Sequence, residues 1–376
     1  MERHVNLSRI SRAGTACVVG AVALTLTACG SDDPAAVGAN DGSAPSPAAA
    51  ISGTFAGAGS SAQKAAIDAW TAAFQSQNPD ATVNYDPSGS GAGREQFLAG
   101  GVQWAGSDSA LTGEEIEAAK AVCGTGGAWD IPVYISPIAL AFNVPGVEEL
   151  NLSAENVAKI FAGTITTWND PVLVADNPQA ALPDLAITPV HRSDKSGTTN
   201  NFTDWLNQTA PEAWPHEKND VWPLEGGDSA EKTSGVIGVV TDTPGAITYA
   251  DESGVGTELG VAAITVGENF NKPSAEGAAN VVSSSPLIEG RPAHDLAVEI
   301  DRTAAAEGDY PLLLVSYTIV CSHYQDQAEG NFVKAFVGLQ VSEAGQQVAA
   351  SAAGSAPLAG EIATRAIAAV EAITVG

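Results

Sequence analysis

The stretch Leu185-Ala-Ile-Thr-Pro-Val-His-Arg-Ser-Asp-Lys-Ser-Gly-Thr198 is the most informative part of this chain of 376 residues. A strand-like run, Leu185–Val190, leads into a polar loop, and the amphipathic run Asn201–Leu206 predicts a helix directly after it. The first turn of a helix has unpaired N–H donors and a partial positive charge, and the guanidinium of Arg192 offers a planar fork of further donors. This strand-loop-helix unit therefore indicates a place where an anion can bind.

Two further segments repeat the order of strand, Gly/Ser-rich loop and helix. Gly57-Ala-Gly-Ser-Ser61 follows a strand expected over Ile51–Ala56 and precedes a helix with apolar residues at positions 67, 70 and 74. The loop Ser88–Gly93, which contains Ser90, follows a strand expected over Ala81–Tyr85. A serine at a helix start is an ordinary N-cap. Three such loops with glycine, which lets backbone donors approach a ligand closely, favour one shared anion site.

The alternation of strands and helices predicts an α/β fold in which ligands bind at the carboxyl ends of strands. Residues 51–376 exceed the size at which a single core stops growing, so we expect two lobes. Two long apolar runs, Ile131–Val144 and Tyr310–Cys321, predict buried strands that pass between the lobes. We also expect a strand in 102–108, helices over 154–161 and 229–240, loops over 164–171 and 215–227, and C-terminal helices around Phe332, Phe336 and Leu339.

The first 28 residues predict a signal peptide, because three arginines precede a short apolar stretch that ends in small residues. That stretch is shorter than the roughly 20 residues that a membrane-spanning helix needs. Leu26-Thr-Ala-Cys29 resembles the lipobox of bacterial lipoproteins, which implies lipid attachment at Cys29; an ordinary signal peptide with a chance cysteine is the alternative. Residues 29–50 are rich in small and polar residues and predict a flexible tether.

The formal net charge is −28, and beyond residue 28 the chain has 13 basic and 43 acidic residues. Such a surface disfavours binding to nucleic acid or to an anionic membrane. It does not exclude an anion site, because salt screens distant charges over roughly 8–10 Å. Beyond the signal peptide and Cys29, only Cys123 and Cys321 remain; in an exported protein this pair favours a disulfide, with two buried thiols as the alternative. The scattered histidines and cysteines show no zinc-like spacing, so we expect no metal and no cofactor.

Several other functions are disfavoured by the sequence. No G-x-G-x-x-G and no G-x-x-x-x-G-K-[ST] motif is complete, which argues against nucleotide binding. His191 and Ser196 lack a recognisable orienting acid and oxyanion hole, so we interpret His191 as a neutral wall residue rather than a catalytic base. Trp70 and Trp205 are expected to pack in the core, whereas Trp168 either lines the cleft or belongs to the core.

Five motifs together resemble the periplasmic phosphate-binding proteins of phosphate ABC transporters, in their actinobacterial lipoprotein form. They are Gly57-Ala-Gly-Ser-Ser-Ala62, Tyr85-Asp-Pro-Ser-Gly-Ser-Gly91, Gly106-Ser-Asp108, Gly163-Thr-Ile-Thr-Thr-Trp168 with Asn169-Asp170, and His191–Thr198. The resemblance covers nearly all of residues 51–376. It implies a two-lobed, hinge-linked periplasmic-binding-protein fold of type II, with the anion site in the cleft between lobe 1 (51–135 and 312–376) and lobe 2 (136–311).

The resemblance also implies which residues contact phosphate. They are Ser61, Ala62, Ser90, Asp108, Arg192, Ser196, Gly197 and Thr198, with Asp194 orienting Arg192 through an ion pair. This chain departs from the family pattern with serine at 61, alanine instead of phenylalanine at 62, and lysine instead of glycine at 195. The alanine leaves less apolar cover over the anion, which lowers the expected affinity.

Asp108 places a carboxylate in a site that is otherwise rich in donors. A phosphate mono- or dianion still carries a proton, and an ionised aspartate can accept a hydrogen bond from it. Sulfate at neutral pH has no such proton, so the two negative groups repel each other. The alternative role for Asp108 is a helix N-cap before Leu111-Thr-Gly-Glu.

We therefore expect a lipid-anchored solute-binding protein on the extracytoplasmic face of the cell membrane. It would capture inorganic phosphate and deliver it to the permease and ATPase of an ABC importer. We expect no catalytic residue, and a monomer that contacts the membrane only through its N-terminal lipid. The alternatives are a binder of another oxyanion such as sulfate or molybdate, an extracellular phosphatase, and a phosphate-binding surface antigen or sensor.

Overall fold

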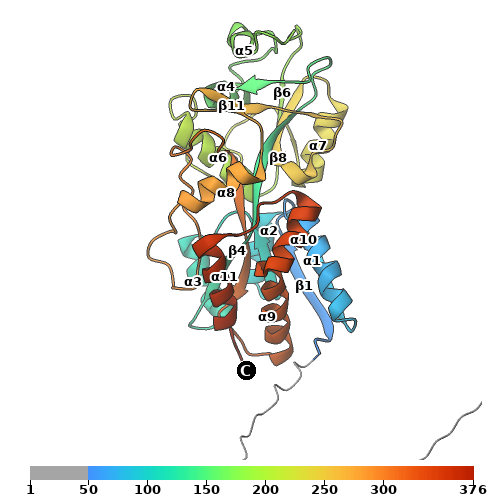
Figure 1. The fold of residues 1–376 in the computed structure, drawn as a ribbon, viewed down its shortest axis with the longest axis vertical. Coiled ribbons are helices and arrows are strands. Elements are labelled where there is room, and N and C mark those ends of the chain that lie inside the picture. Colours follow the sequence, from blue (N-terminus) through green and yellow to red (C-terminus); the bar gives the residue numbers. More distant parts are fainter. Residues whose placement is uncertain (1–49) are drawn as a thin grey trace, which may run out of the picture. The chain divides into compact units, whose positions relative to one another are not determined.

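The computed structural model describes residues 50–376 (Figure 1). The expected signal peptide, the expected lipidation site Cys29 and all but the last residue of the expected tether lie outside the described residues. Within residues 50–376, no helix combines the length and the apolar character needed to cross a membrane.

Strands and helices alternate over most of the described chain, so the predicted α/β class is confirmed. The strands are β1 Gly53–Gly59, β2 Ala81–Asp86, β3 Trp104–Ser107, β4 Ala128–Phe142, β5 Asn151–Leu152, β6 Thr188–Arg192, β7 Asp228–Ala230, β8 Ala246–Asp251, β9 Gly260–Val261, β10 Ala263–Val266, β11 Asn269–Asn271, β12 Leu313–Cys321, β13 His323–Tyr324 and β14 Thr374–Val375. The helices are α1 Lys64–Gln77, α2 Ser90–Leu98, α3 Gly113–Cys123, α4 Ala154–Phe161, α5 Pro171–Asp176, α6 Gly197–Thr209, α7 Lys232–Asp242, α8 Ala275–Ser284, α9 Gln327–Val341, α10 Glu343–Ala353 and α11 Gly360–Ala372, with a 3₁₀ turn η1 at Glu252–Gly254.

The strand β4 joins the two halves of the main sheet. The strand order is β2-β1-β3-β12-β4-β8-β6-β7, and β9 also pairs with β4. The first part of β4 pairs antiparallel with β12, from Ala128 opposite Cys321 to Pro137 opposite Leu313. From Ile138 onward β4 pairs antiparallel with β8 instead. The chain therefore passes along β4 from one set of strands into the other (Figure 1).

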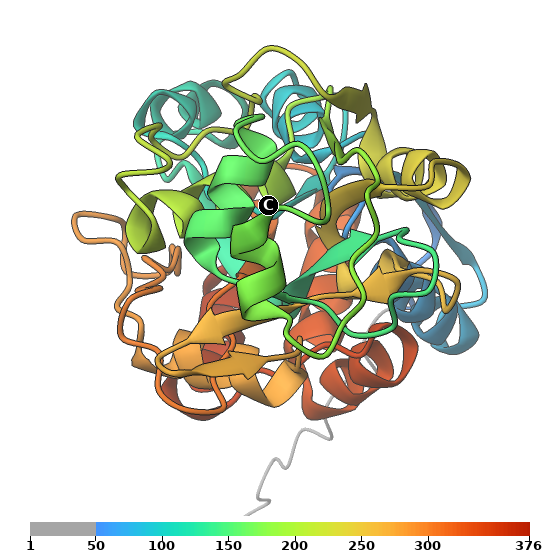
Figure 2. The same ribbon diagram turned by 90° about the horizontal axis from the view of Figure 1, so that it is seen from above.

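We call these two sets of strands the first and the second lobe. The first lobe contains β1, β2, β3 and β12 with α1, α2, α3, α9, α10 and α11; the second contains β6, β7, β8 and β9 with α4, α5, α6 and α7. In the second lobe, α6 and α7 both contact β8 and lie on different sides of it (Figure 2). The residue boundaries that the sequence suggested for the lobes, 51–135, 136–311 and 312–376, stay a prediction.

Apolar patterning explains the principal elements. All residues of β4 are buried, which suits a strand that has neighbours on both edges and is covered on both faces. In α1 the residues Ile67, Trp70 and Phe74, spaced three and four apart, face the core, and the helix ends at Gln77, just before Asn78-Pro79. The predicted strand over Ile131–Val144 and the predicted helix after Ser61 are therefore confirmed.

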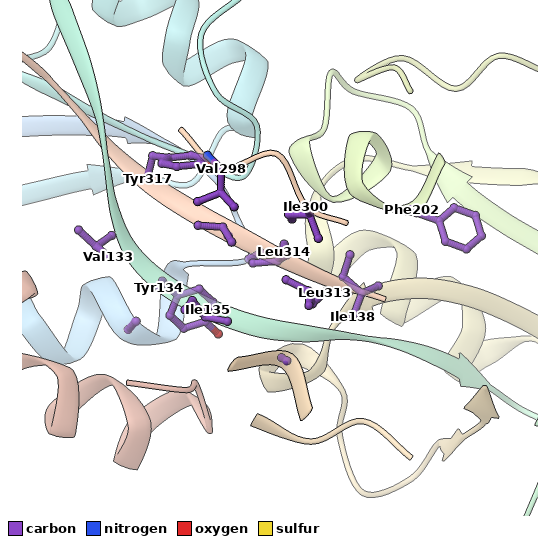
Figure 3. Close-up of a cluster of buried hydrophobic side chains, with 14 of the residues drawn as sticks. Val133, Tyr134, Ile135, Ile138, Phe202, Val298, Ile300, Leu313, Leu314 and Tyr317 are labelled. Atoms are coloured by element: carbon purple, nitrogen blue, oxygen red, sulfur yellow. The ribbon is translucent and has the colours of Figure 1, made fainter. Parts of the chain in front are cut away.

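The core continues along the two strands that connect the lobes. Figure 3 shows side chains of β4 and β12 side by side, among them Val133 and Ile138 from β4 and Leu314 from β12. Ile300, from the segment that precedes β12, packs into the same cluster. A fully buried side chain of this kind contributes about 1.5–3 kcal/mol relative to an exposed one.

The structure settles two points that the sequence left open, the state of the cysteine pair and the place of Trp168, and it confirms a third. Cys123 at the end of α3 and Cys321 at the end of β12 form a disulfide, with their Cα atoms 5.0 Å apart. Trp70 and Trp205 are buried in the core, as predicted. Trp168 is also fully buried, and its indole N–H donates to the carbonyl of Gly245 at 3.0 Å, so it belongs to the core rather than to a cleft.

The predicted helix over 229–240 is wrong at its start. Asp228–Ala230 form β7, which pairs in parallel with the free edge of β6, and the helix α7 begins only at Lys232. The short polar run has no apolar alternation, so its strand depends on the neighbouring β6 rather than on its own pattern. The helix α2 begins at Ser90, inside the stretch expected to be a loop.

Candidate anion-binding site

The carboxyl ends of the strands bring the three predicted loops together. In the first lobe β1 is parallel to both β2 and β3, so the loops after Gly59, Asp86 and Ser107 emerge at one edge. In the second lobe β6 ends at Arg192, and the loop after it meets the first-lobe loops directly: the N–H of Gly91 donates to the carbonyl of Lys195 at 3.1 Å. The two lobes are therefore in contact around these loops.

In the first loop, the side chain of Ser60 bonds the backbone of the residues that precede α1. Its hydroxyl oxygen accepts from the N–H of Ala62 at 3.1 Å and from the N–H of Gln63 at 3.3 Å, just before α1. Gly59, which precedes it, has φ of +142°, and a Cβ there would lie 1.9 Å from the carbonyl oxygen of Gly106. Glycine at 59 thus lets the end of β1 approach the end of β3, which leads to Asp108.

The second loop brings Ser90 to Asp108. Gly89 precedes α2 with φ of +103°, and Ser90 is the first residue of the helix. The Ser90 hydroxyl accepts from the N–H of Asp108 at 3.2 Å and donates to Asp108 Oδ2 at 3.3 Å. A Cβ at Gly89 would lie 2.5 Å from Asp194 Oδ2, so glycine here allows the second lobe to come close.

Asp108 is 3% exposed and is surrounded by hydroxyl donors. Ser316 of β12 donates to its Oδ1 at 2.6 Å, while Ser90 and Thr198 each donate to its Oδ2 at 3.3 Å. Burial raises the pKa of Asp108, and the hydroxyls of Ser316 and Ser60 together with the charge of Arg192 oppose this rise. The two oxygens thus differ: Oδ1 has a short bond, and Oδ2 has two long ones.

The alternative role of Asp108 as an N-cap of the next helix does not hold. The helix α3 is capped by Thr112, whose hydroxyl accepts from the N–H of Glu115 at 3.3 Å. The side chain of Glu115 accepts in return from the N–H of Thr112 at 2.8 Å, which completes a capping box. The carboxylate of Asp108 therefore has no capping role and points to the hydroxyls between the lobes.

Arg192 lies at the end of β6 and is 3% exposed. Its Nε donates to Asp194 Oδ1 at 2.7 Å and its Nη2 to Asp194 Oδ2 at 2.5 Å. Burial by itself raises the pKa of Asp194. The hydrogen bonds and the charge of Arg192 lower this pKa by more than burial raises it, so the net shift is downward. Among the described residues, no side chain or carbonyl accepts from Nη1 of Arg192, which leaves one edge of the guanidinium for another partner.

The third loop begins α6. The Ser196 hydroxyl accepts from the N–H of Thr199 at 3.2 Å, so it caps the helix. A Cβ at Gly197 would lie 2.7 Å from Ser90 Oγ and 2.8 Å from the Cβ of Asp108. Only glycine allows the start of α6 to approach both first-lobe residues so closely.

Three backbone donors at these helix starts lack an acceptor. Within residues 50–376, no carbonyl or side chain accepts from the buried N–H groups of Ser90, Gly197 and Thr198. Leaving a buried donor unpaired costs about 1–3 kcal/mol. The start of α2 lies close to the start of α6, because a Cβ at Gly197 would lie 2.7 Å from Ser90 Oγ, and both helix starts have unpaired donors, which suits an anion.

Most of the residues predicted for the site converge, but Ser61 has another partner. Its hydroxyl lies 3.0 Å from Oγ1 of Thr233 and accepts from the N–H of Thr233 at 3.0 Å, at the start of α7. Ala62 is buried next to it. The sequence analysis missed Thr233, Ser60 and Ser316. For Ser316 a signal was present, because it is a polar residue in the middle of a buried apolar strand.

His191 and Ser196 do not form a pair of catalytic base and nucleophile in the structure. The ring of His191 stacks on Trp222 with centroids 4.9 Å apart, and its Nδ1 lies 3.0 Å from the carbonyl oxygen of Arg192. The hydroxyl of Ser196 is taken up by helix capping. In the described part of the chain, no three His, Cys, Asp or Glu side chains are grouped so that they could hold a metal ion.

Two lobes joined by long strands, with helix starts from both lobes directed at one buried site, define a two-lobed solute-binding protein. In agreement, the family model described as "PBP superfamily domain" matches residues 44–344. Phosphate-binding protein PstS 3 of Mycobacterium leprae is 35% identical over 337 residues, which cover 88% of this chain and 90% of the relative. Phosphate-binding protein PstS 2 of Mycobacterium tuberculosis is 34% identical over 376 residues, which cover 97% and 100%. The chain belongs to the PstS family of phosphate-binding proteins.

Solved structures support the fold. A high-affinity periplasmic phosphate-binding protein bound with phosphate superposes with a TM-score of 0.68 at 22% identity, over 84% of this chain and 93% of that one. A phosphate-binding protein from Stenotrophomonas maltophilia gives a TM-score of 0.67 at 18% identity, over 84% and 94%. The two-lobed periplasmic-binding-protein fold expected from the sequence is therefore confirmed.

Proposed function

We propose that this protein binds inorganic phosphate between its lobes and delivers it to the permease and ATPase complex of an ABC importer. The observation that carries this proposal is the set of buried N–H donors of Ser90, Gly197 and Thr198 that have no acceptor, together with the free edge of Arg192. Donors of this kind suit a tetrahedral oxyanion. The names of the PstS relatives support phosphate as the ion.

Asp108 gives the selectivity for a protonated oxyanion. Its Oδ1 keeps the short bond from Ser316, whereas the hydroxyls of Ser90 and Thr198 reach its Oδ2 only at 3.3 Å. These two hydroxyls turn from the aspartate to the oxygens of the bound ion, and Oδ2 then accepts the proton of phosphate. Sulfate offers no proton at this point, so its charge faces an uncompensated carboxylate.

The remaining contacts of the site complete the proposal. Ser61 and Ala62, just before α1, remain part of the proposed site, and the Ser61 hydroxyl, which bonds Thr233 in the structure, would turn to the ion. Ser196 and Gly197 hold the start of α6 in place, and Asp194 orients Arg192. Binding uses hydrogen bonds, helix starts and one guanidinium, so no bond of the ligand is broken and the protein is not an enzyme. It needs no metal and no cofactor.

The proposed delivery to a permease implies that the protein acts outside the cytoplasm, and a periplasmic phosphate-binding protein among the solved structures of the same fold supports this location. We include in the proposal a signal peptide of residues 1–28, lipid attachment at Cys29 and a tether over 29–50, all of which lie outside the described residues. A tether of this length spans roughly 25 Å as a flexible chain. The globular part is then a monomer held near the membrane by its lipid.

Isothermal titration of the protein with phosphate, sulfate and a phosphate monoester tests the proposal, together with an assay for ester hydrolysis. We expect one phosphate per chain, no hydrolysis, and a preference over sulfate of roughly 10⁴-fold, as in other sites built to pair with a ligand proton. Equal binding of the two ions would refute the role of Asp108. Steady release of phosphate from the ester would favour a phosphatase instead.

A further inference from the structure

Arg94 of α2 connects the two lobes outside the anion site. It is 4% exposed, and its Nε donates to Glu115 Oε1 of the same lobe at 3.0 Å. Its Nη1 donates to the hydroxyls of Ser107 at 3.1 Å and Ser109 at 2.8 Å, also in the first lobe. Its Nη2 donates to Asp220 Oδ2, which lies in the second lobe between α6 and β7. The guanidinium therefore binds residues of both lobes at once.

The partners of Arg94 are attached to the anion site on both sides. Ser107 and Ser109 flank Asp108 in the loop after β3. The backbone carbonyl of Asp220 accepts from the N–H of Ser196 at 2.9 Å, and Ser196 is the cap of α6. Arg94 thus links the loop that carries Asp108 to the helix start that carries the second-lobe donors, without contacting the place where the ion binds.

The two carboxylates of Arg94 behave differently when the lobes separate. Glu115 stays with the arginine because both belong to the first lobe, whereas Asp220 leaves with the second lobe. In the structure, the other oxygen of Asp220, Oδ1, is buried and has no hydrogen-bond partner among the described residues. Its Oδ2 has Arg94 and, at 3.4 Å, the hydroxyl of Ser109. The burial of Asp220 is therefore compensated mainly by Arg94, and only while the lobes are closed.

A second ion pair between the lobes provides the contrast. Lys195 pairs with Glu95 of α2, but the two side chains are 56% and 61% exposed. Exposed pairs of this kind stabilise a protein by about 0–1 kcal/mol, because water and salt screen them. The side chains of Arg94 and Asp220 are only 5% and 14% exposed, so their attraction is much less screened.

We propose that Arg94 and Asp220 form a latch that sets how long the lobes stay closed over the bound ion. This inference rests on the proposed phosphate binding. Arg94 is a positioning residue in it, because all its hydrogen bonds go to protein groups. Since the ion escapes only from separated lobes, losing the latch raises the dissociation rate constant, whereas association with the open form changes little.

Stopped-flow kinetics of inorganic phosphate with the Asp220→Asn variant tests the latch. Asparagine keeps the shape and the backbone bond to Ser196 but removes the charge. We expect the dissociation rate constant to rise roughly 10- to 100-fold, within the range known for close buried charge pairs, and the association rate constant to change by less than about threefold. Small-angle scattering with saturating phosphate checks that a larger fraction of the variant is open.

Two matched variants control for charge and for folding. Glu95→Gln removes the exposed pair between the lobes and should leave both rate constants within about twofold of the wild type. Glu115→Gln removes the other carboxylate of Arg94, within one lobe, and should lower the melting temperature more than it changes dissociation. An unchanged dissociation rate in Asp220→Asn, or an equal rise in Glu95→Gln, would overturn the latch. Failure of the wild type to bind phosphate would instead refute the proposed function.

Discussion

Arg192 and Arg94 are both buried arginines near the same site, yet their partners differ. Arg192 pairs with a single carboxylate of its own loop, Asp194, and one edge of its guanidinium remains free. Arg94 is surrounded by two carboxylates and two serine hydroxyls that use all three of its nitrogens. The two arginines are equally buried, so it is the number of acceptors around each guanidinium that distinguishes the proposed ligand-binding arginine from the arginine that joins the two lobes.

The largest effect should follow from Arg192→Ala. It removes the donor edge for the ion and leaves Asp194 buried without its cation, and truncation of such buried charge pairs costs 2–5 kcal/mol or more. We expect the phosphate affinity measured by titration calorimetry to fall by roughly 10³-fold, with the fold retained by circular dichroism. Wild-type phosphate affinity in this variant would contradict the proposed difference between the two arginines, because the free edge of Arg192 would then not contact the ion.

Asp251 is a buried carboxyl that pairs with neither Arg192 nor Arg94, so it shows the effect of burial without a cation. It lies at the end of β8, accepts from Tyr134 at 3.1 Å and from the N–H of Ser253 at 3.0 Å, and burial raises its pKa to about 7. The folded protein thus keeps a proton that the unfolded chain loses near pH 4. This contribution to the free energy of unfolding is full below about pH 4 and is lost as the pH rises through about 7.

Asp251→Asn should therefore flatten the pH dependence of stability. Asparagine retains the acceptor oxygen but cannot ionise, so the variant should avoid about 2–4 kcal/mol of the destabilisation that the wild type suffers between pH 4 and 8. Chemical denaturation at several pH values measures this difference. Parallel curves for the two proteins would show that Asp251 is ionised in the fold despite its burial.

Asp108→Asn tests whether the carboxylate of Asp108 causes the preference for phosphate over sulfate. Asparagine cannot accept the phosphate proton with a full charge, but it also no longer repels sulfate. We expect phosphate to bind roughly 10- to 100-fold more weakly and the preference over sulfate to shrink by more than that, in line with the cost of an unpaired buried polar group. Competition titration with both ions measures the ratio, and an unchanged ratio would exclude Asp108 as the source of selectivity.

The smallest effect is expected for Ser316→Ala. It removes the 2.6 Å bond that holds Oδ1 of Asp108, so the carboxylate loses a fixed orientation. A hydrogen bond to a charged group contributes about 1.5–3 kcal/mol, which corresponds to at least about a tenfold loss of phosphate affinity. Ser136→Ala on β4 is the control for losing a buried hydroxyl, because Ser136 bonds the carbonyl of Pro137 and the carboxyl of Asp251 rather than Asp108. Equal losses in both variants would mean that only core packing was disturbed.

The sequence predicted the elements that rest on local patterns. The apolar runs of β4 and β12 and the spacing of Ile67, Trp70 and Phe74 require burial wherever they fold, so their strands and helix were identified. The three loops with glycine and serine were recognised because helix starts have a fixed chemistry. The closeness of these loops could be expected from the parallel strands and from the family resemblance.

The parts that were missed depend on pairing across the molecule. Asp220 lies in an irregular aromatic loop, and nothing in its own segment indicates that Arg94 of the other lobe will reach it. The strand β7 exists because β6 offers it an edge. The bond from the N–H of Thr233 to the hydroxyl of Ser61 is a further contact of this kind, because it depends on where α7 begins and not on the sequence around Ser61. Such contacts depend on how the two lobes are arranged, and the sequence of a single segment does not predict that arrangement.

The disulfide between Cys123 and Cys321 has a consequence for the integrity of the chain. It links the chain just outside the two strands that lead to the second lobe, and the two cysteines are separated by 198 residues in sequence number. The second lobe is thereby a covalent loop, and restricting a loop of this size in the unfolded chain corresponds to about 5 kcal/mol in the chain-entropy treatment. A protease that cuts once anywhere in the second lobe leaves both fragments bonded to each other, so the N-terminal strands and the C-terminal helices of the first lobe cannot be separated by a single cleavage there.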